Sequence, residues 1–235
     1  KFDKLLFFYL FIWVGNFSKD ISGPDGVPDG VIDDYDKTNI GSPMPKFTFG
    51  WTNTFRYKNF DLSVFINGSY GNKVYNYLSM KLTHMNSPWT NQLNAVNGRA
   101  QLVPINPNKV YEDGTMWYND VSNVMVANPG ASIPRATIND PNDNDRISDR
   151  YIEDGSYIRL KNISLGYTFP KKTIDKLGLS NLRIYANIQN LLTITGYDGY
   201  DPEIGASTSS VNVYGLDNGR YPSPTVYSFG LNVSF

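Results

Sequence analysis

The sequence contains no cysteine and only one histidine among its 235 residues. The absence of cysteine excludes a disulfide framework, a thiolate metal site and a cysteine nucleophile. A Ser-His-Asp arrangement would have to use His84, and no nucleophile motif surrounds that residue. Acidic and basic residues balance to a net charge of -1, so the chain lacks the basic surplus that binds nucleic-acid phosphates. We therefore expect no thiol chemistry and no nucleic-acid partner.

A long hydrophobic run is also missing. The apolar stretch that follows Lys4 ends at Val14, which makes it too short for a membrane-spanning helix. It resembles the core of a secretory signal, but the next residues, GNFSKD, offer no small-residue cleavage site. We predict a strand within residues 1–14, and the sequence leaves its register open.

Aromatic residues, by contrast, make up 14% of the chain, and the last ten residues, VYSFGLNVSF, show how they are arranged. Every second residue there is apolar, and the residues between them are small or polar. Successive side chains of a strand point to opposite faces, so this segment is predicted to be an amphipathic strand. Its apolar positions are Tyr227, Phe229, Leu231, Val233 and Phe235.

Four further segments show the same alternation of apolar and polar residues. Each is about ten residues long, which is the length that crosses a bilayer as a tilted strand. A charge-poor polar face rich in threonine, serine and asparagine accompanies each apolar face. The four segments are residues 46–57, 60–70, 157–169 and 181–190.

The connections between these strands alternate in length. Residues 58–59 and 170–180 are short links, and the second is predicted to contain a helical turn that ends at Gly178. Residues 15–45, 71–156 and 191–222 are long. Outer-membrane barrels have short periplasmic turns and long external loops.

If the C-terminus lies at the periplasmic rim, every short link falls on the periplasmic side. This ordering favours an all-β, antiparallel, transmembrane β-barrel. A soluble sandwich would not require all short links to lie on one side. Five or six strands cannot close a barrel, and open edges are not tolerated in lipid. We therefore expect the chain to be the C-terminal part of a larger barrel or one subunit of a shared barrel.

Several long motifs resemble one family of such barrels. They are SDRYIEDGSYIRLKNISLGYTFP (148–170), LRIYANIQNLLTITGYDGYDPEIG (182–205), DGVIDDYDKTNIGSPMPKFTFGW (29–51) and RYPSPTVYSFGLNVSF (220–235). Together they resemble the C-terminal third of SusC/RagA-family TonB-linked outer-membrane proteins of Bacteroidetes. The resemblance extends over roughly residues 15–235, and the first fourteen residues depart from it.

The resemblance implies a 22-stranded barrel, an N-terminal plug and a TonB contact sequence, with the last two outside this chain. It also implies a multi-pass protein in contact with outer-membrane lipid and lipopolysaccharide. A SusD-like surface lipoprotein would be the partner, and oligosaccharides or peptides the cargo. The five apolar residues of the last strand, from Tyr227 to Phe235, would serve as the signal for assembly into the outer membrane. No enzymatic activity is implied.

The segment DGVPDGVIDDYD has the spacing of a calcium-binding loop. Asp25, Asp29 and Asp36 occupy positions 1, 5 and 12 of such a loop, and Gly30 occupies position 6. Val27, however, stands at position 3, where an oxygen ligand is expected. We therefore favour a solvated acidic turn, and we retain the three aspartates as the candidate calcium ligands.

Two other groups of residues could carry chemistry. Asp140, Asp143, Asp145 and Asp149 form an acidic cluster, but a loop rich in proline and asparagine does not fix the carboxylate separation that a glycosidase needs. We expect a polar surface loop there. The aromatic residues predicted in the long loops could stack on sugar rings, pack against the lipoprotein or pack within their own loops. They are Trp89, Trp117, Tyr118, Tyr197 and Tyr200.

Two basic residues interrupt the apolar face of the strand at 157–169. Arg159 and Lys161 share the parity of Ile163 and Leu165. Either their charged ends reach the lipid head groups, or a bulge around Lys161 and Asn162 reverses the alternation. We favour the first interpretation, because charge costs little at the membrane interface.

Three functions are compatible with these features. A SusC-like importer is favoured, and a structural or adhesive barrel without transport is the alternative. An outer-membrane hydrolase that uses the acidic cluster is disfavoured, because the chain has only one histidine and those carboxylates lie in a loop.

Overall fold

The structure is a computed structural model that describes residues 20–30, 32–138, 140, 144–204 and 214–235. The strand predicted within residues 1–14 lies outside this part of the chain. Contacts divide the chain into two compact units. One unit comprises residues 1–42 and 75–152, and the other comprises residues 43–74 and 153–235.

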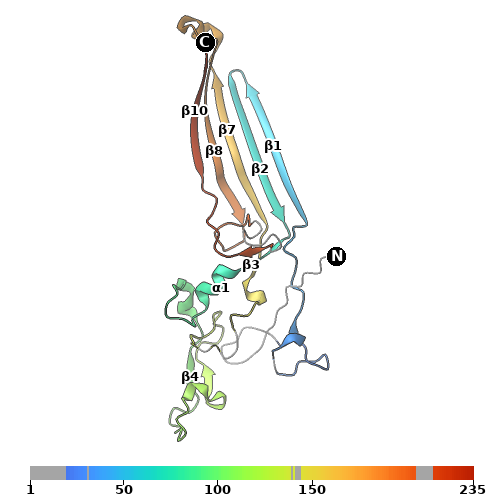
Figure 1. Cartoon of the computed structure of the whole chain (residues 1–235), viewed down its shortest axis with the longest axis vertical. Helices are drawn as coiled ribbons and strands as arrows, with labels where there is room; N and C mark the ends of the chain where they lie inside the picture. Colours follow the sequence, from blue (N-terminus) through green and yellow to red (C-terminus); the bar gives the residue numbers. More distant parts are fainter. Residues whose placement is uncertain (1–19, 31, 139, 141–143, 205–213) are drawn as a thin grey trace. The chain divides into compact units, whose positions relative to one another are not determined.

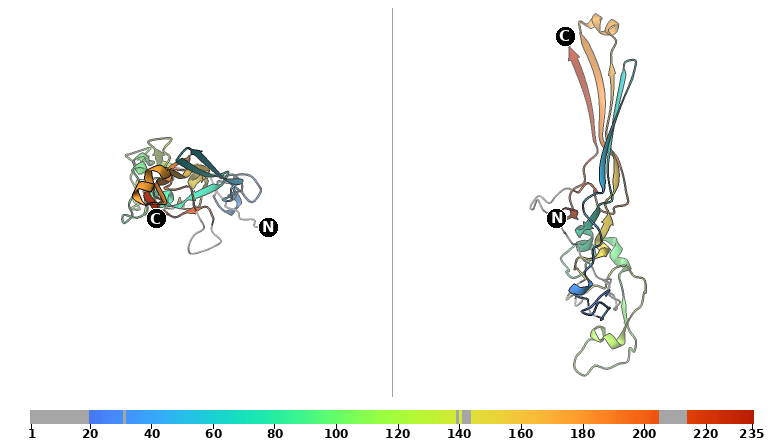
Figure 2. Two further views of the ribbon diagram at one scale, coloured as in Figure 1. Left: turned by 90° about the horizontal axis from the view of Figure 1, so that it is seen from above. Right: turned by 90° about the vertical axis from the view of Figure 1, so that its right-hand side faces the viewer.

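A five-stranded antiparallel sheet dominates the second unit, and its strands run side by side in Figure 1 and in the right-hand view of Figure 2. The strand order is β1-β2-β7-β8-β10. All five predicted strands are confirmed, and β10 pairs with β8 as expected. The strands are β1 (Phe47–Tyr57), β2 (Phe60–Tyr70), β7 (Tyr157–Thr168), β8 (Asn181–Thr195) and β10 (Val226–Ser234).

The sheet has one apolar face and one polar face. Register places Leu62 of β2 opposite Phe55 of β1 and Leu165 of β7, so the apolar parities of neighbouring strands coincide. Many of these large apolar side chains are exposed; Phe229, for example, is 84% exposed. An extended exposed apolar surface marks an interaction with a membrane or a partner. The apolar face comprises Phe49, Trp51, Phe55, Leu62, Val64, Ile163, Leu165, Ile184, Ile188, Phe229 and Leu231.

Aromatic rings border the apolar face at both ends. At one end, the ring centroids of Phe47 and Tyr70 are 5.4 Å apart. At the other end, the centroids of Phe60 and Tyr167 are 4.7 Å apart, and Phe169 adds an edge-on contact with Tyr167. The apolar band therefore lies between two rows of aromatic side chains.

Both short connections lie at the same end of the sheet (Figure 1). Lys58 and Asn59 form a two-residue turn in which Lys58 has a φ of 52°. The second connection holds α2 (Lys171–Ile174) and the 3-10 helix η6 (Asp175–Leu177). Gly178 caps η6 with a φ of 69°, which confirms the predicted helical turn and its end.

The remaining elements are short. Strands β3 (Lys73–Asn76), β6 (Ile152–Asp154) and β9 (Leu216–Asp217) form a three-stranded sheet, and β4 (Leu102–Pro104) pairs with β5 (Val124–Val126). The first unit also holds α1 (Tyr77–Thr83). The other 3-10 helices are η1 (Asp34–Asp36), η2 (Asn94–Gly98), η3 (Trp117–Asn119), η4 (Val121–Asn123) and η5 (Asp149–Tyr151). None of the helices in the described ranges is long and apolar enough to cross a membrane.

Candidate functional site

A break in the alternation of β7 creates the most highly connected polar site of the second unit. Ile66 of β2 pairs with Leu160, and the preceding Phe65 pairs with Asn162, so Lys161 is an extra residue in β7. The extra residue moves Ile158 and Leu160 to the apolar face and turns Arg159 to the polar face. The favoured prediction for Arg159 and Lys161, that their charges reach lipid head groups, was therefore wrong. The bulge that we had considered as the alternative is present.

The same irregularity lengthens β8. Leu160 pairs with Leu192 and Asn162 pairs with Gln189, so two residues of β8, Asn190 and Leu191, lie opposite Lys161. Asn190 has a φ of 52°, in the left-handed region where asparagine is tolerated best after glycine. The strand continues to Thr195 and not to residue 190 as predicted, because Leu192 and Ile194 pair with Leu160 and Ile158 beyond this bulge.

Arg159 is the centre of the site, with only 3% of its surface exposed. Its Nη2 donates to Asp201 Oδ1 at 2.5 Å and its Nη1 to Glu203 Oε2 at 2.6 Å. Its Nε donates to the Thr193 hydroxyl at 2.8 Å. Each of the three guanidinium nitrogens thus donates a hydrogen bond, which compensates for the removal of the charge from water.

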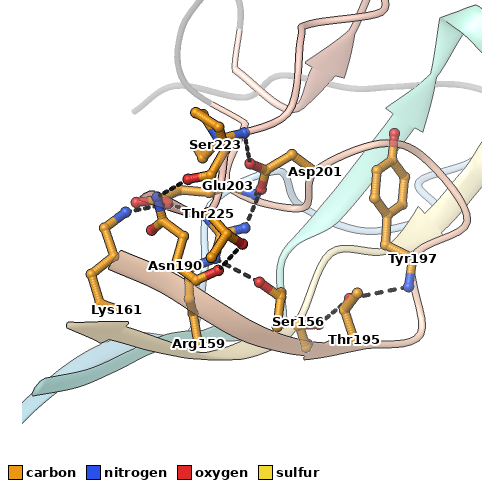
Figure 3. A network of polar contacts seen from close by, with 12 residues as sticks. Ser156, Arg159, Lys161, Asn190, Thr195, Tyr197, Asp201, Glu203, Ser223 and Thr225 are labelled. Carbon is orange, nitrogen blue, oxygen red and sulfur yellow. Dashed lines mark hydrogen bonds and ion pairs between the residues drawn. The ribbon is translucent and has the colours of Figure 1, made fainter. Parts of the chain in front are cut away.

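Asp201 connects the beginning and the end of the segment between β8 and β10 (Figure 3). Besides Arg159, its carboxylate accepts hydrogen bonds from the backbone N–H groups of Glu203 at 2.9 Å and Ser223 at 2.9 Å. Burial by itself would raise the pKa of Asp201. The hydrogen bond from Arg159 and the two backbone N–H groups outweigh burial and lower its pKa to about 2.

Lys161 completes the charge balance of the site. Its Nζ donates to Glu203 Oε2 at 2.7 Å, so Glu203 bridges Arg159 and Lys161. Two cations and two carboxylates therefore form one neutral cluster on the polar face. We call Arg159, Lys161, Thr193, Asp201, Glu203 and Ser223 the Arg159 network.

A cavity of about 540 Å³ adjoins this network. Lys161, Glu203 and Ser223 contribute polar atoms to its wall, and Tyr214 and Arg220 also line it. The structure shows no ion-pair partner for the Arg220 side chain among the described residues. The cavity can therefore offer hydrogen-bond donors and acceptors together with the Arg220 cation to a polar molecule, and the buried Arg159 and Asp201 hold its wall in place.

A second anchor holds the segment that follows β8. The Tyr197 hydroxyl donates to Asp217 Oδ2 at 2.6 Å, and both residues are buried. Burial and then the hydrogen bond to Asp217 raise the pKa of Tyr197. Of the aromatic residues predicted in the loops, Tyr197 thus packs within its own loop, whereas Trp89 is 92% exposed.

Curated proteins related to the chain are receptors. It is 34% identical to TonB-dependent receptor P3 of Formosa agariphila over 226 residues, which are 94% of this chain and 19% of that receptor. It is 29% identical to TonB-dependent receptor SusC of Bacteroides thetaiotaomicron over 210 residues, or 88% of this chain and 17% of SusC. No protein-family model matches it.

Solved structures agree in fold. A structure of the RagAB peptide transporter aligns with a TM-score of 0.70 at 18% identity over 98% of this chain and 22% of that one. A RagAB peptide importer in its closed-closed state aligns at 0.62, with 21% identity over 91% of this chain and 20% of that one.

The chain belongs to the SusC/RagA-type TonB-dependent receptors. The resemblance inferred from its motifs is thereby confirmed. The chain spans about a fifth of the length of the curated relatives that it matches.

Asp36, one of the three candidate calcium ligands, binds backbone N–H groups in the structure. Asp36 is fully buried, and its two carboxylate oxygens accept the backbone N–H groups of Ile21, Ser22 and Asp33. Asp25 and Asp29 are exposed. Calcium binding by Asp25, Asp29 and Asp36 stays a prediction, and it would require Asp36 to exchange backbone donors for the ion.

The acidic residues of the predicted loop cluster differ in exposure. Asp140 is buried, Asp145 and Asp149 are exposed, and Asp143 lies outside the described residues. The five apolar residues of the predicted assembly signal are all exposed on the apolar face of β10 or just after it. Their role in assembly stays a prediction.

Sequence reasoning missed Asp201 and Glu203 as partners of Arg159. They lie in the motif YDGYDPEIG, 42 and 44 residues after Arg159 in the chain. One feature of the sequence could have pointed to such partners: Arg159 and Lys161 alternate in phase with the apolar residues of β7. Two charges at such positions need either lipid head groups or acidic side chains as partners.

A second ion pair crosses the polar face near the short turns. Arg183 of β8 donates to both carboxylate oxygens of Asp61 on β2, at 3.2 and 2.6 Å. Gly166 of β7 lies between them, and a Cβ at that position would collide with the Arg183 guanidinium and the Asp61 carboxylate. The glycine thus allows an ion pair to pass over the intervening strand.

Proposed function

We propose that this chain forms part of the wall of a 22-stranded outer-membrane β-barrel in a TonB-dependent importer. The importer would take up oligosaccharides or peptides together with a SusD-like surface lipoprotein. TonB would bind a region outside this chain. Kinship with named TonB-dependent receptors supports the family role, and the two-faced sheet supports the place of this chain within it.

The observation that carries the proposal is the exposed apolar face between two rows of aromatic residues. Phe60 and Tyr70 lie ten residues apart on β2. At about 3.4 Å per residue and a tilt of about 40°, this separation corresponds to roughly 26 Å along the membrane normal. Transmembrane barrels carry an apolar band about 25 Å tall between aromatic girdles.

The polar face would then face the barrel interior. Its ion pairs, Arg159 with Asp201 and Arg183 with Asp61, cost far less there than in contact with lipid. The cavity beside the Arg159 network would lie at the end of the sheet from which the long connections emerge, where a transported molecule would enter.

The connections define an orientation that supports this proposal. We place Lys58, Asn59 and residues 170–180 in the periplasm, and residues 15–45, 71–156 and 191–222 outside the cell. Because the segment contains no cysteine, single cysteines can be introduced at Lys58 and at Val110, which is 82% exposed. An impermeant thiol reagent applied to intact cells should label Val110→Cys and leave Lys58→Cys unlabelled until the membrane is opened. The reverse pattern would overturn the orientation.

A further inference from the structure

The only histidine of the chain, His84, lies in the first unit in a group that the transport proposal does not use. His84 is the residue that ends α1, and its side chain is 9% exposed. Its Nε2 lies 2.9 Å from Oδ2 of the buried Asp140. One ligand atom each from His84, Asp140 and Asp145 lie within 4.8 Å of one another. One imidazole nitrogen and two carboxylate oxygens therefore converge from two distant parts of the sequence.

We propose that His84, Asp140 and Asp145 bind a divalent transition-metal ion, with Zn²⁺ as the representative. Imidazole and carboxylate groups are the usual ligands of such ions in proteins. In the tetrahedral coordination that zinc prefers, bonds of about 2.0–2.1 Å place two ligand atoms about 3.3 Å apart. His84 Nε2 and Asp140 Oδ2 are 2.9 Å apart, so the two side chains need to separate by only about 0.4 Å to bind the same ion.

The surroundings hold one ligand in place and leave another free to adjust. Asn144 donates its side-chain amide to Asp140 Oδ1 at 2.6 Å, which orients the carboxylate so that Oδ2 lies beside His84 and also accepts the backbone N–H of Asp145 at 3.3 Å. Such support is typical of the groups around metal ligands. The Asp145 carboxylate is exposed and has no ion-pair partner among the described residues, so a small rotation can bring it to the ion.

Charge also favours a cation at this position. Asp140 and Asp145 bring two carboxylates within 4.8 Å of each other. A divalent ion between them would be attracted by both carboxylates.

The test measures metal content in the complete receptor, purified in detergent and treated with a chelator. Zn²⁺ is added, excess ion is removed by gel filtration, and bound zinc is counted by mass spectrometry. A competing fluorescent chelator gives the affinity. Wild type should retain one Zn²⁺ more than the His84→Asn variant, and Asp145→Asn should weaken that site at least about tenfold.

Asp149→Asn is the matched control, because it removes the same charge from an exposed aspartate outside the group. It should bind zinc as the wild type does. Asp145→Asn changes only an exposed side chain, so it tests the site even if His84→Asn misfolds. Equal zinc content and affinity in wild type and Asp145→Asn, or an equal loss in Asp149→Asn, would overturn the proposal.

Calcium is measured on the same samples with Asp29→Asn as the variant of the acidic loop. The transition-metal site predicts that His84→Asn leaves calcium binding unchanged. If His84→Asn lost both zinc and calcium while Asp29→Asn bound calcium as the wild type does, His84 would belong to a general cation site. That result would overturn the preference for transition metals. None of these readouts depends on transport.

Discussion

At the scale of single residues, Arg159 is the most consequential side chain of the sheet. The bulge in β7 turns its charge to the polar face of the sheet. Its ion pairs with Asp201 and Glu203 connect the segment after β8 to β7. A buried ion pair contributes little net stability compared with apolar residues, but loss of one partner leaves the other charge buried and uncompensated. The contribution of Arg159 to stability therefore depends on its partner Asp201, which is only 6% exposed.

Arg159→Met should destabilise the segment around Asp201 by about 3–5 kcal/mol, because it leaves the Asp201 carboxylate without its guanidinium. Hydrogen exchange of the Ser223 and Glu203 amides in the intact receptor measures this loss. Lys161→Met is the control and should cost about 0–1 kcal/mol, since Lys161 is partly exposed and Glu203 is its one ion-pair partner among the residues that the structure describes. Adding Asp201→Asn to Arg159→Met should recover part of the protection; no recovery would contradict the pairing.

The low pKa of Asp201 predicts a specific acid sensitivity. Its folded-state pKa of about 2 lies below its ordinary value of 3.8. A lowered pKa stabilises the fold above pH 3.8, and this contribution, about 2 kcal/mol, disappears as the pH falls through 2. Denaturant unfolding of wild type and Asp201→Asn across this window should give a steeper pH dependence in wild type. Identical slopes would contradict the assignment.

At the scale of elements, the alternation of apolar and polar residues predicted all five strands of the sheet and which residues share a face. It named a bulge around Lys161 and Asn162 only as the alternative and could not decide for it, because one extra residue leaves both halves of β7 with valid alternation and shifts only their relative phase. It also could not identify the acids that pair with Arg159, since they are separated from it by more than forty residues of chain. The turn at Gly178 was predictable because a left-handed helix end favours glycine.

Gly166 gives a prediction at this scale. Gly166→Ala should break the ion pair between Asp61 and Arg183 and cost about 1–3 kcal/mol, because the new methyl group occupies the space that both side chains use. Urea unfolding of the purified receptor measures the change. Gly196→Ala is the control, since a Cβ there meets nothing within 4 Å.

A second change separates the ion pair from a general packing defect. Asp61→Asn should destabilise the wild type but have little further effect on Gly166→Ala, because the pair is already broken in that background. Full additivity of the two substitutions would contradict an ion pair that passes over Gly166.

At the scale of the whole molecule, the exposed apolar face requires a partner, and lipid fits its dimensions and its aromatic borders. The sequence motifs predicted the family correctly, because long stretches of the strands and their connections retain its pattern. The group of His84, Asp140 and Asp145 could not be predicted, since only folding brings residues so distant in sequence together.

The most direct measurement compares arginine at two neighbouring positions of β7. Leu165 lies on the apolar face, 48% exposed, and Ser164 lies on the polar face. Leu165→Arg should lower the stability of the inserted receptor by about 2–4 kcal/mol and reduce its amount in the outer membrane, because the charge would face lipid. Ser164→Arg should change both quantities much less, because it faces the barrel interior. Equal losses, or a greater loss from Ser164→Arg, would contradict a wall whose apolar face meets the membrane.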